Sequence, residues 1–331
     1  MKALVTGGGG FLGGVIVRML RERGDEVRSF SRADYPALHK LGVEQFRGDL
    51  GDQPAVSAAA RGCDTVFHVA AKAGIWGDYG EFYRANVTGS ANVLEACRVN
   101  GIGRLVYTSS PSVVFDGGDV EGGDESLPYP PRYEAHYPKT KAAAEQMVLA
   151  ANSPGLATVA LRPHLIWGPG DNHLLPRILA KGRAGRLYRI GERPNLVDTV
   201  YVDNAARAHL LAADRLAPGQ PPAGRAYFIS NGQPIPLWEM VNRILAAAGI
   251  PPVTRSISPG LAYSAGCICE AIWGLLHRSG EPPMTRFVAH ELSSAHWFDI
   301  SSARQDLGYH PEVSIDEGLL SLRQWLQDNR A

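Results

Sequence analysis

The 331-residue sequence predicts an α/β protein built on a doubly wound parallel sheet, with a smaller, mostly helical C-terminal domain. Short apolar or β-branched runs alternate with longer amphipathic stretches through the first half, which is typical of β-α-β units. A glycine-rich turn joins the first run to the first helical stretch. After about Trp167 the alternation stops at a Gly-Pro-Gly-Asp break, and a second domain is expected to begin there.

The expected elements of the first half follow one another at short intervals. Thr65–Val69 and Leu105–Tyr107 are almost entirely apolar, as strands buried on both faces of a parallel sheet should be. Apolar residues recur at spacings of three and four between Val87 and Cys97, which predicts an amphipathic helix. In chain order the sequence predicts strands over 3–6, 26–30, 65–69, 105–108 and 158–161, and helices over 11–23, 82–100 and 136–151.

Residues 1–167 are expected to form the first domain, and residues 168–194 with 232–331 the second. Residues 195–231 are expected to return in part to the first domain. Within them, Asn195–Asp203 and Tyr227–Ser230 have strand character and could rejoin the first sheet. Helices are predicted over 237–248 and 314–327.

Charge and cysteine content exclude several classes of protein. The 33 basic and 33 acidic residues cancel, so nucleic acid is not an expected partner. Four scattered cysteines are too few for a disulfide framework, and no second Cys or His pair accompanies Cys267 and Cys269 to bind a metal. The N-terminus has no signal-peptide pattern. A cytoplasmic protein without a metal site is therefore predicted.

Gly260–Leu276 is the one segment that raises the question of a membrane, because it is apolar over about the shortest length that can span a bilayer. Glu270 lies past its middle, and a carboxylate there opposes insertion by roughly 2.5 to 3.5 kcal/mol. We expect a buried or substrate-covering helix and no spanning segment. A helix that rests on a membrane surface stays open as the alternative.

A phosphate-binding loop is predicted at the start of the chain. Gly7, Gly10 and Gly13 follow the first strand at GxxGxxG spacing and lead directly into a helix. Gly7 can make the tight turn, Gly10 lets backbone N–H groups approach a pyrophosphate, and Gly13 lets the helix pack on the strand. A merely flexible glycine loop would not explain the helix that starts at Phe11. The first domain is therefore expected to be a dinucleotide-binding Rossmann domain.

The end of the second strand should decide which nicotinamide cofactor binds. An acidic residue there would hold the ribose 2′-hydroxyl of NAD, but this chain has Ser31 and Arg32. A hydroxyl followed by a guanidinium can hydrogen-bond a 2′-phosphate, so NADP(H) is predicted. The alternative is that Arg32 is a solvated loop charge and Asp34 binds the ribose.

Tyr137 and Lys141 have the YxxxK spacing at the start of a helix, one turn apart on the same face. A phenol of pKa about 10 is a poor acid and base at neutral pH. An ammonium at about 4 Å contributes roughly 4 kcal/mol at an effective dielectric of about 20, which would bring Tyr137 into working range.

Ser110 follows the strand 105–108, at the edge of the sheet where ligands bind in such folds. It is predicted to orient a substrate carbonyl. Ser109 and Ser112 are weaker candidates that are typical of a capped turn. Asn86 lies inside a predicted helix, where asparagine is disfavoured, so it is expected to make a backbone or water contact.

Together these motifs resemble an extended short-chain dehydrogenase/reductase over nearly the whole chain. Within that superfamily the chain most closely resembles the sterol-type 3β-hydroxysteroid dehydrogenase branch, and its members that reduce 2-alkyl-3-ketoalkanoic acids in bacterial long-chain olefin biosynthesis. The residues that carry the broad resemblance are 6–13 (TGGGGFLG), 48–50 (GDL), 68–71 (HVAA), 86–89 (NVTG), 107–110 (YTSS), Tyr137 with Lys141, 161–163 (LRP), 167–170 (WGPG) and 201–204 (YVDN). The closer resemblance rests on 72–77 (KAGIWG), 165–171 (LIWGPGD), 226–232 (AYFISNG) and 280–283 (GEPP).

The resemblance implies a role for each matching residue. Tyr137 would protonate a ketone, Lys141 would hold the nicotinamide ribose and lower the pKa of the tyrosine, Ser110 would polarise the carbonyl, and Asn86 would hold a proton-relaying group. Asp49 and Leu50 would lie by the adenine, Ala70 and Ala71 by the nicotinamide-side ribose, and Pro163 beside the nicotinamide. The implied cofactor contacts are Gly7, Gly10, Phe11, Leu12, Gly13, Ser31, Arg32, Asp49, Leu50, Ala70, Ala71, Thr108, Tyr137, Lys141 and Pro163.

The implied substrate is a β-ketoacid with two long alkyl chains. Trp76, Trp167 and the segment 260–276 would form an apolar cleft, with His164 near the carboxylate. By the same resemblance a homodimer is expected through the helices 82–100 and 136–151, and an assembly with neighbouring pathway enzymes stays open. So do other functions: a 3β-hydroxysterol dehydrogenase, a nucleotide-sugar epimerase or dehydratase that uses the arginines between Arg177 and Arg193, and a non-catalytic NADP-binding module.

Overall fold

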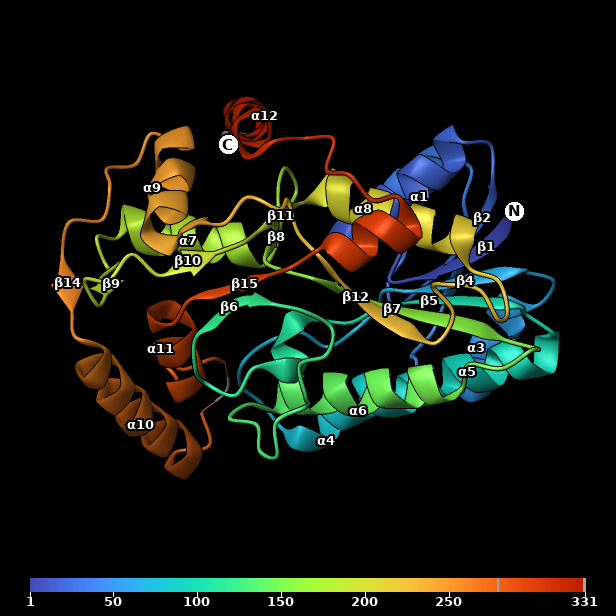
Figure 1. The fold of residues 1–331 in the computed structure, drawn as a ribbon, viewed down its shortest axis with the longest axis horizontal. Coiled ribbons are helices and arrows are strands. Elements are labelled where there is room, and N and C mark those ends of the chain that lie inside the picture. Colours follow the sequence, from blue (N-terminus) through green and yellow to red (C-terminus); the bar gives the residue numbers. More distant parts are fainter. Residues whose placement is uncertain (279, 330–331) are drawn as a thin grey trace.

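The computed structural model describes residues 1–278 and 280–329, and its centre is a parallel sheet of seven strands. The strand order is β3-β2-β1-β4-β5-β7-β12 (Figure 1). The order reverses at β1, so the carboxyl ends of β1 and β4 meet at a switch point on one edge of the sheet. This arrangement confirms the predicted fold class. The strands are β1 (Lys2–Thr6), β2 (Glu26–Ser31), β3 (Glu44–Arg47), β4 (Thr65–His68), β5 (Arg104–Thr108), β7 (Ala157–Pro163) and β12 (Arg225–Ile229).

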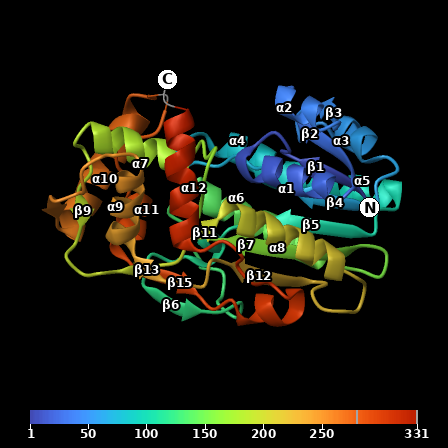
Figure 2. The same ribbon diagram turned by 90° about the horizontal axis from the view of Figure 1, so that it is seen from above.

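Helices cover both faces of this sheet, and each face has its own hydrophobic core. On one face α1 and α8 lie side by side, with Val17 and Ala206 buried between them and the strands (Figures 1 and 2). On the other face α3, α5 and α6 enclose a core that contains Val93 and Val148. The bounds are α1 (Phe11–Glu22), α3 (Gln53–Ala60), α5 (Gly89–Asn100), α6 (His136–Ala150) and α8 (Val202–Arg215).

Three elements between residues 36 and 60 were not predicted from the sequence. They are α2 (Pro36–Lys40), β3 and α3. β3 reads Glu-Gln-Phe-Arg and is an edge strand without a fully buried residue, so it has no apolar run to reveal it. Asp52 caps α3 by accepting a hydrogen bond from the Ala55 N–H at 3.1 Å.

The predicted helix 82–100 begins earlier and is not uniform. It consists of α4 (Tyr79–Phe82), a π-helical turn over Tyr83–Thr88, and α5. The π turn contains Asn86, which is buried. Such turns insert one residue into the helical repeat and frequently mark functional sites. The local irregularity therefore lies where the sequence placed a disfavoured asparagine.

One expectation about the second half is confirmed and one is wrong. Residues 225–229 return to the first sheet as β12, which pairs parallel to β7. Residues 195–203 do not return to it. There β10 (Leu196–Val197) pairs with β13 (Ile235–Pro236) and β15 (His296–Phe298), while β11 (Val200–Tyr201) pairs with β8 (Ile166–Trp167). β12 occupies the position beside β7, so residues 195–203 do not pair with that strand.

A second sheet, with the strand order β13-β10-β15-β6, lies in the C-terminal part. Its strand β6 (Val120–Gly123) comes from the first half of the chain and pairs with β15. Five helices pack around a third hydrophobic core that includes Trp167 and Trp238. They are α7 (Leu174–Arg183), α9 (Leu237–Ala247), α10 (Pro259–Leu275), α11 (Arg286–Ser293) and α12 (Ile315–Asp328).

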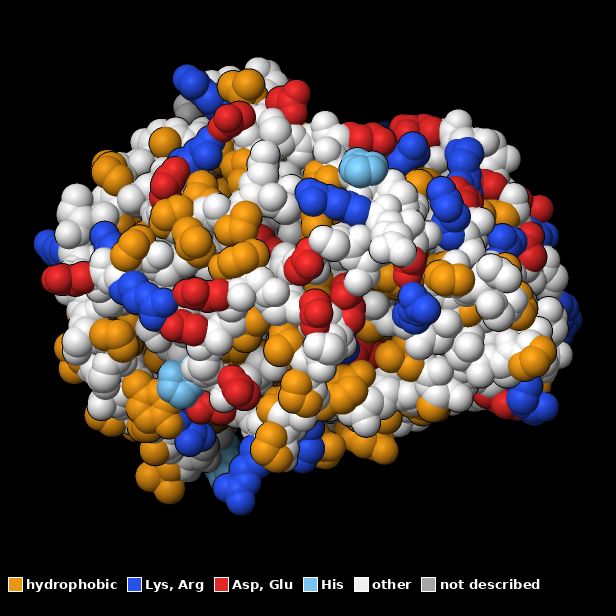
Figure 3. Space-filling view, in the orientation of Figure 1, with side chains coloured by type: hydrophobic (Ala, Val, Ile, Leu, Met, Phe, Trp, Pro, Cys, Tyr) orange, Lys and Arg blue, Asp and Glu red, His pale blue; other side chains and the backbone are white. Residues whose placement is uncertain are grey.

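The apolar segment 260–276 forms α10, which leaves much of its surface exposed. Its exposed fractions include 58 % at Leu261, 60 % at Ile268 and 81 % at Leu275. Figure 3 shows apolar side chains gathered at the lower left, where α10 lies in Figure 1. Across residues 1–278 and 280–329, no helix has the length and hydrophobicity needed to cross a bilayer.

Candidate active site

The glycine-rich loop joins β1 to α1 by a close approach of backbone to backbone. Gly7 has a φ of +73°, and its carbonyl accepts the N–H of Gly10 at 2.9 Å. A Cβ on Gly13 would lie 2.1 Å from the Gly7 oxygen, and one on Gly7 would lie 3.0 Å from Ala70. Only glycine fits at these positions, which is what a loop that cradles a pyrophosphate requires.

A buried chain of hydrogen bonds runs from the carboxyl end of β1 to the π-helical turn. The Ala70 N–H donates to Thr6 Oγ1 at 3.2 Å, and Thr6 lies 2.8 Å from His68 Nδ1. His68 Nε2 lies 3.0 Å from Ser90 Oγ, which in turn donates to the Asn86 carbonyl at 2.6 Å. Burial lowers the pKa of His68 to about 3, so its ring is neutral. Every hydrogen-bond donor in this series of side chains is therefore matched with one acceptor.

Asn86 makes the backbone contact that the sequence predicted. Its Oδ1 accepts the Lys72 N–H at 2.8 Å, and its Nδ2 donates to the Lys72 carbonyl at 3.1 Å. Nδ2 also donates to Thr140 Oγ1 at 3.0 Å. The loop after β4, the π turn and α6 are thus held together by one amide.

Lys141 is buried at the centre of the site. Its Nζ donates to the Thr108 carbonyl at 2.5 Å and lies 4.1 Å from the ring centre of Tyr107. Burial lowers the pKa of Lys141 to about 7, although the charge of Glu145 opposes this. Thr108 is itself anchored, since its Oγ1 lies 2.8 Å from His209 Nε2.

The expected lowering of the Tyr137 pKa by Lys141 is not found. Burial raises the pKa of Tyr137, a hydrogen bond with Ser110 opposes the rise, and the charge of Glu291 adds to it. The ammonium of Lys141 is directed to the Thr108 carbonyl, so it does not act on the phenol. In this geometry Tyr137 is a protonated phenol, which suits a proton donor.

Ser110 lies directly after β5, as predicted, and its hydroxyl opposes the rise in the pKa of Tyr137. Its Oγ lies 2.9 Å from Ser112 Oγ and accepts the Ser112 N–H at 3.2 Å. The hydroxyl of Ser109 is buried and has no partner in the described part of the chain. The structure therefore brings together Tyr137, Ser110 and Lys141 at one edge of the sheet.

The carboxyl end of β2 fits a 2′-phosphate. Ser31 has a buried hydroxyl with no partner within residues 1–278 and 280–329, and Arg32 is exposed beside it. Asp34, the alternative ribose ligand, is already paired with His39 Nε2 at 3.0 Å. An orphaned donor next to an available guanidinium suits an anionic group better than a ribose hydroxyl.

The remaining predicted cofactor residues lie around the same edge. Asp49 accepts the Gly51 N–H at 2.7 Å and lies 3.4 Å from Arg84, so its carboxylate is partly engaged. Leu50 packs against Gly89 of α5. The others are Phe11 and Leu12 at the start of α1, Ala70 and Ala71 after β4, and Pro163 at the end of β7.

A cleft of about 530 Å³ opens beside the first turn of α6, which carries Tyr137. Trp76 lines it, as predicted, opposite Cys267 and Ala271 of α10. Phe287 of α11 and His136 also line it, together with the charged side chains of Glu134, Glu270 and Arg286. The cleft thus combines apolar side chains with an ion pair, since Glu270 pairs with Arg286 at 2.7 Å.

Trp167 does not line this cleft. It is fully buried in the third core, where its Nε1 donates to Thr199 Oγ1 at 3.0 Å. Trp167 is a residue of β8, and its large side chain packs that strand into the third core instead. Two of the arginines predicted to clamp a diphosphate are engaged elsewhere, because Arg177 pairs with Glu281 at 2.8 Å and Arg193 with Asp119 at 2.6 Å.

His164 lies in a buried cluster whose other members the sequence did not indicate. Its Nδ1 is 2.5 Å from Asp198 Oδ1, and its Nε2 is 3.2 Å from His296 Nδ1. Glu291 on α11 was also missed, although its charge acts on both Tyr137 and His164. Burial raises the pKa of Glu291 to about 7. These residues are far apart in sequence and belong to no motif.

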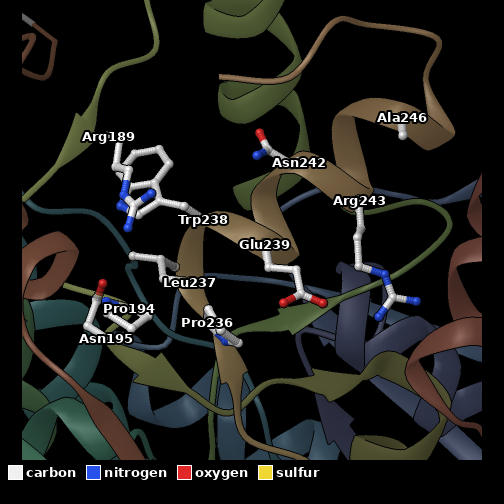
Figure 4. A pocket seen from close by; sticks show the side chains of 10 residues that line it. All are labelled: Arg189, Pro194, Asn195, Pro236, Leu237, Trp238, Glu239, Asn242, Arg243 and Ala246. Atoms are coloured by element: carbon white, nitrogen blue, oxygen red, sulfur yellow. The ribbon is translucent and has the colours of Figure 1, made fainter. Parts of the chain in front are cut away.

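A second cavity, of about 470 Å³, lies on the far side of the C-terminal part beside α9. Figure 4 shows the indole of Trp238 beside the guanidinium of Arg189 at one end of it. None of the predicted catalytic, cofactor or substrate residues lines this cavity. Trp76 is the one predicted site residue among those that line the first cleft, and Tyr137 follows directly after His136 on its wall.

Known proteins resemble the chain over almost its whole length. Residues 4–257 match the 3-beta hydroxysteroid dehydrogenase/isomerase family. A 2-alkyl-3-oxoalkanoate reductase of Stenotrophomonas maltophilia is 56 % identical over 325 residues, covering 98 % of each chain. A protein of the same name from Shewanella oneidensis is 50 % identical, covering 97 % of this chain and 85 % of the relative.

Solved structures share the fold. The UDP-glucose 4-epimerase of Thermus thermophilus, in complex with NAD, superposes with a TM-score of 0.75 at 27 % identity, covering 99 % of this chain and 100 % of the other. The chain therefore belongs to the 3-beta hydroxysteroid dehydrogenase/isomerase family of extended short-chain dehydrogenases/reductases, and it is an NAD(P)-dependent oxidoreductase that acts on a hydroxyl or keto group.

Proposed function

We propose that the enzyme reduces the 3-keto group of a 2-alkyl-3-ketoalkanoic acid with NADPH, giving the 2-alkyl-3-hydroxy acid in long-chain olefin biosynthesis. The names of the two relatives at 56 % and 50 % identity support this substrate class. The structural observation that supports it is the cleft beside the first turn of α6, where Trp76, Cys267, Ala271 and Phe287 supply apolar surface. Such a surface suits an alkyl chain better than a sugar.

The choice of NADPH rests on the end of β2. Ser31 offers an unpartnered hydroxyl and Arg32 an exposed guanidinium, and both can bind a 2′-phosphate. Gly7, Gly10 and Gly13 leave room for the pyrophosphate. When bound, the reduced nicotinamide would supply the hydride.

The side chains of the site would do the rest. Tyr137 gives its proton to the ketone oxygen, and Ser110 donates a hydrogen bond to that oxygen. Lys141 holds the nicotinamide-side ribose. Asn86 keeps the loop after β4 fixed to α6 and can hold a proton-relaying water.

The substrate would lie with its alkyl chains along Trp76 and α10 and with its carboxylate toward His164. Trp76 is on the wall of the cleft, and His164 follows directly after Pro163 at the end of β7. The two ends of the site then differ in polarity, as the two ends of a fatty β-ketoacid do.

An NADPH oxidation assay with 2-alkyl-3-ketoacids, sterols and UDP-sugars tests the proposal. We expect turnover with the ketoacids and none with UDP-sugars. Faster oxidation of a 3β-hydroxysterol than reduction of any ketoacid would favour the second candidate, a hydroxysterol dehydrogenase, which the family description supports. The ion pairs of Arg177 and Arg193 argue against a nucleotide-sugar site.

A further inference from the structure

The helix α10 presents three different faces. Its inner face is buried at Ala262 and Gly266, and a Cβ on Gly266 would lie 2.7 Å from the Thr285 backbone. A second face lines the cleft through Cys267 and Ala271. Within the described part of the chain, the third face is neither buried nor part of the cleft.

This third face is a row of large apolar side chains, which we call the α10 stripe. It consists of Leu261 (58 % exposed), Ile268 (60 %), Ile272 (41 %), Leu275 (81 %) and Leu276 (55 %). The first four follow one another at spacings of seven, four and three residues, which places them on one side of a helix. Contiguous exposed apolar surface of this kind marks a site for another apolar surface.

The α10 stripe adjoins the cleft. Cys267 lines the cleft and Ile268 belongs to the stripe, and the same holds for Ala271 and Ile272. Consecutive residues lie about 100° apart around a helix, since about 3.6 residues make one turn. The two surfaces are therefore neighbours on α10, and whatever covers the stripe lies beside the cleft.

Charges at the two ends of the α10 stripe indicate what covers it. Arg255 precedes α10 and Arg278 follows it, and both are exposed. Among the described residues neither arginine forms an ion pair. Glu270, the one acidic residue of α10, is paired with Arg286 at 2.7 Å on the side of the cleft. An apolar face bounded by arginines is typical of a helix that lies in the interface of an anionic membrane.

Acidic side chains near the two ends offset only part of this charge. Glu192 is exposed in the turn whose Gly191 N–H donates to the Ile257 carbonyl at 2.9 Å, just before α10. Glu281, beyond the other end, is already paired with Arg177 at 2.8 Å. The ends of the stripe therefore keep an excess of positive charge.

The position of α10 fits a flat partner. The helix lies at the outer edge of the molecule in Figure 1, with α11 packed against it. Its 17 residues extend about 25 Å, so a plane can touch the whole stripe. A standard protein interface takes about 800 Å² from each partner and forms about one hydrogen bond per 100–200 Å². The leucine and isoleucine side chains of the stripe form no hydrogen bonds, which favours lipid over protein.

We propose that the α10 stripe docks the enzyme on an anionic lipid surface, so that the cleft opens beside lipid. The leucines and isoleucines enter the boundary between headgroups and acyl chains, and Arg255 and Arg278 contact lipid phosphates. Docking would bring the cleft next to the phase in which a ketoacid with two alkyl chains dissolves best. The docking itself does not depend on the proposed function.

The first experiment is flotation of the full-length protein with vesicles. We expect the wild type to bind an equal mixture of phosphatidylcholine and phosphatidylglycerol, and to bind pure phosphatidylcholine about tenfold more weakly. Ile268→Ser combined with Leu275→Ser should weaken binding to the mixed vesicles by at least about tenfold. Leu320→Ser, at a leucine of α12 that is 66 % exposed, is the matched control and should bind as the wild type does. Failure of the wild type to bind, or equal binding by the double variant, would overturn the proposal.

The second experiment reports contact instead of loss of binding. Ile268→Trp puts an indole on the stripe, and its fluorescence should shift to shorter wavelength when mixed vesicles are added. Leu320→Trp should show no shift. Arg278→Gln should weaken binding to mixed vesicles about fivefold, whereas Arg323→Gln, an exposed arginine of α12, should not. An unshifted Ile268→Trp spectrum in the presence of the vesicles would refute the docking.

Two further outcomes separate the proposal from its alternatives. If a second copy of the chain covers the stripe, light scattering gives half the wild-type mass for the double serine variant and the wild type does not float, which would refute the lipid assignment. Turnover of ketoacids by a protein that does not bind vesicles would refute the docking and leave the proposed function intact.

Discussion

Tyr137 is the residue on which the proposed chemistry depends most directly. Tyr137→Phe removes the acid that protonates the ketone oxygen but leaves the ring in place. Ketone reduction should slow by roughly 10² to 10⁴, while the affinity for NADPH stays within a few-fold. Stopped-flow reduction and cofactor fluorescence titration measure the two effects. Tyr188→Phe, at an exposed tyrosine of the C-terminal part, is the matched control. Near-normal reduction by Tyr137→Phe would mean that another group is the acid.

Arg32 is the residue that should distinguish the two nicotinamide cofactors. Losing its charge-assisted bond to the 2′-phosphate should weaken NADPH roughly ten- to a hundredfold in Arg32→Ala and leave NADH nearly unchanged. Isothermal titration with both cofactors tests this. Arg183→Ala, at an exposed position at the end of α7, should change neither affinity. An equal loss for both cofactors contradicts the assignment.

At the residue scale, local motifs predicted where several side chains lie, and the roles predicted for them stay predictions. The glycine loop, Ser31, Ser110 and Asn86 all lie where they were expected. The prediction that Trp167 lines the cleft rested on its aromatic character alone. Residues of a hydrophobic core share that character, and Trp167 is buried in such a core. His68, Asp198 and Glu291 could not be found, because their roles come from partners distant in sequence.

At the scale of elements, a buried ion pair one helical turn after Lys141 connects α6 to β7. Glu145, one turn after Lys141, pairs with Arg162 of β7 at 2.6 Å, and both side chains are nearly inaccessible. Arg162→Met leaves that carboxylate buried without its cation, so the free energy of unfolding should fall by about 3 to 5 kcal/mol. Urea unfolding followed by circular dichroism measures it.

A double variant separates the pair from simple packing. Arg162→Met combined with Glu145→Leu removes both charges and should recover most of the lost stability. Arg98→Met breaks an exposed pair with Glu95 and should have little effect. If the double variant is no more stable than the single one, the charge left behind is not the cause of the loss.

Elements with a strong apolar period were predicted to within a few residues, and elements without one were not. α9 begins at the predicted residue and ends one residue early, and α12 ends one residue beyond its predicted end. The polar strand β3 and the short helix α2 have too few regularly spaced apolar residues to be predicted from the sequence. Residues 195–203 were predicted as strands and contain two short ones, β10 and β11, but their sequence does not indicate which sheet these strands join. The choice of sheet depends on tertiary contacts and not on the local sequence.

At the scale of the whole molecule, neutral buried histidines make stability sensitive to acid. Burial lowers the pKa of His68 to about 3, and of His209 and His296 to about 4, from 6.5. As the pH falls below 6.5, the unfolded chain binds these protons and the folded one does not. The free energy of unfolding therefore falls, while Glu291, whose pKa is raised to about 7, acts in the opposite sense above 4.5.

The net effect is about two protons, or roughly 3 kcal/mol of stability lost per pH unit between pH 6.5 and 4.5. Urea unfolding at pH 6.5 and 5.5 measures this slope. In His209→Asn one titrating group is gone, so the slope should fall by about half. A variant with the same slope as the wild type would show that the buried histidines are not responsible.

Assembly is a further property of the whole molecule. The predicted homodimer would form where α5 and α6 pack against their copies, since both lie on the same face of the sheet (Figure 1). Multi-angle light scattering should give about twice the mass of one chain. A monomer at micromolar concentration would contradict both this dimer and the proposed larger assembly with other pathway enzymes.

The late return of β12 to the edge of β7 has a consequence for synthesis of the chain. β7 is buried along its whole length, yet its outer neighbour lies beyond residues 164–224, and α8, which covers one face of the sheet, is in that interval too. While the ribosome is still making that interval, the nascent chain has an open apolar strand edge, which is a template for pairing with other chains. Protection of that edge must come from chaperones or from the speed of translation until Ile229 has emerged.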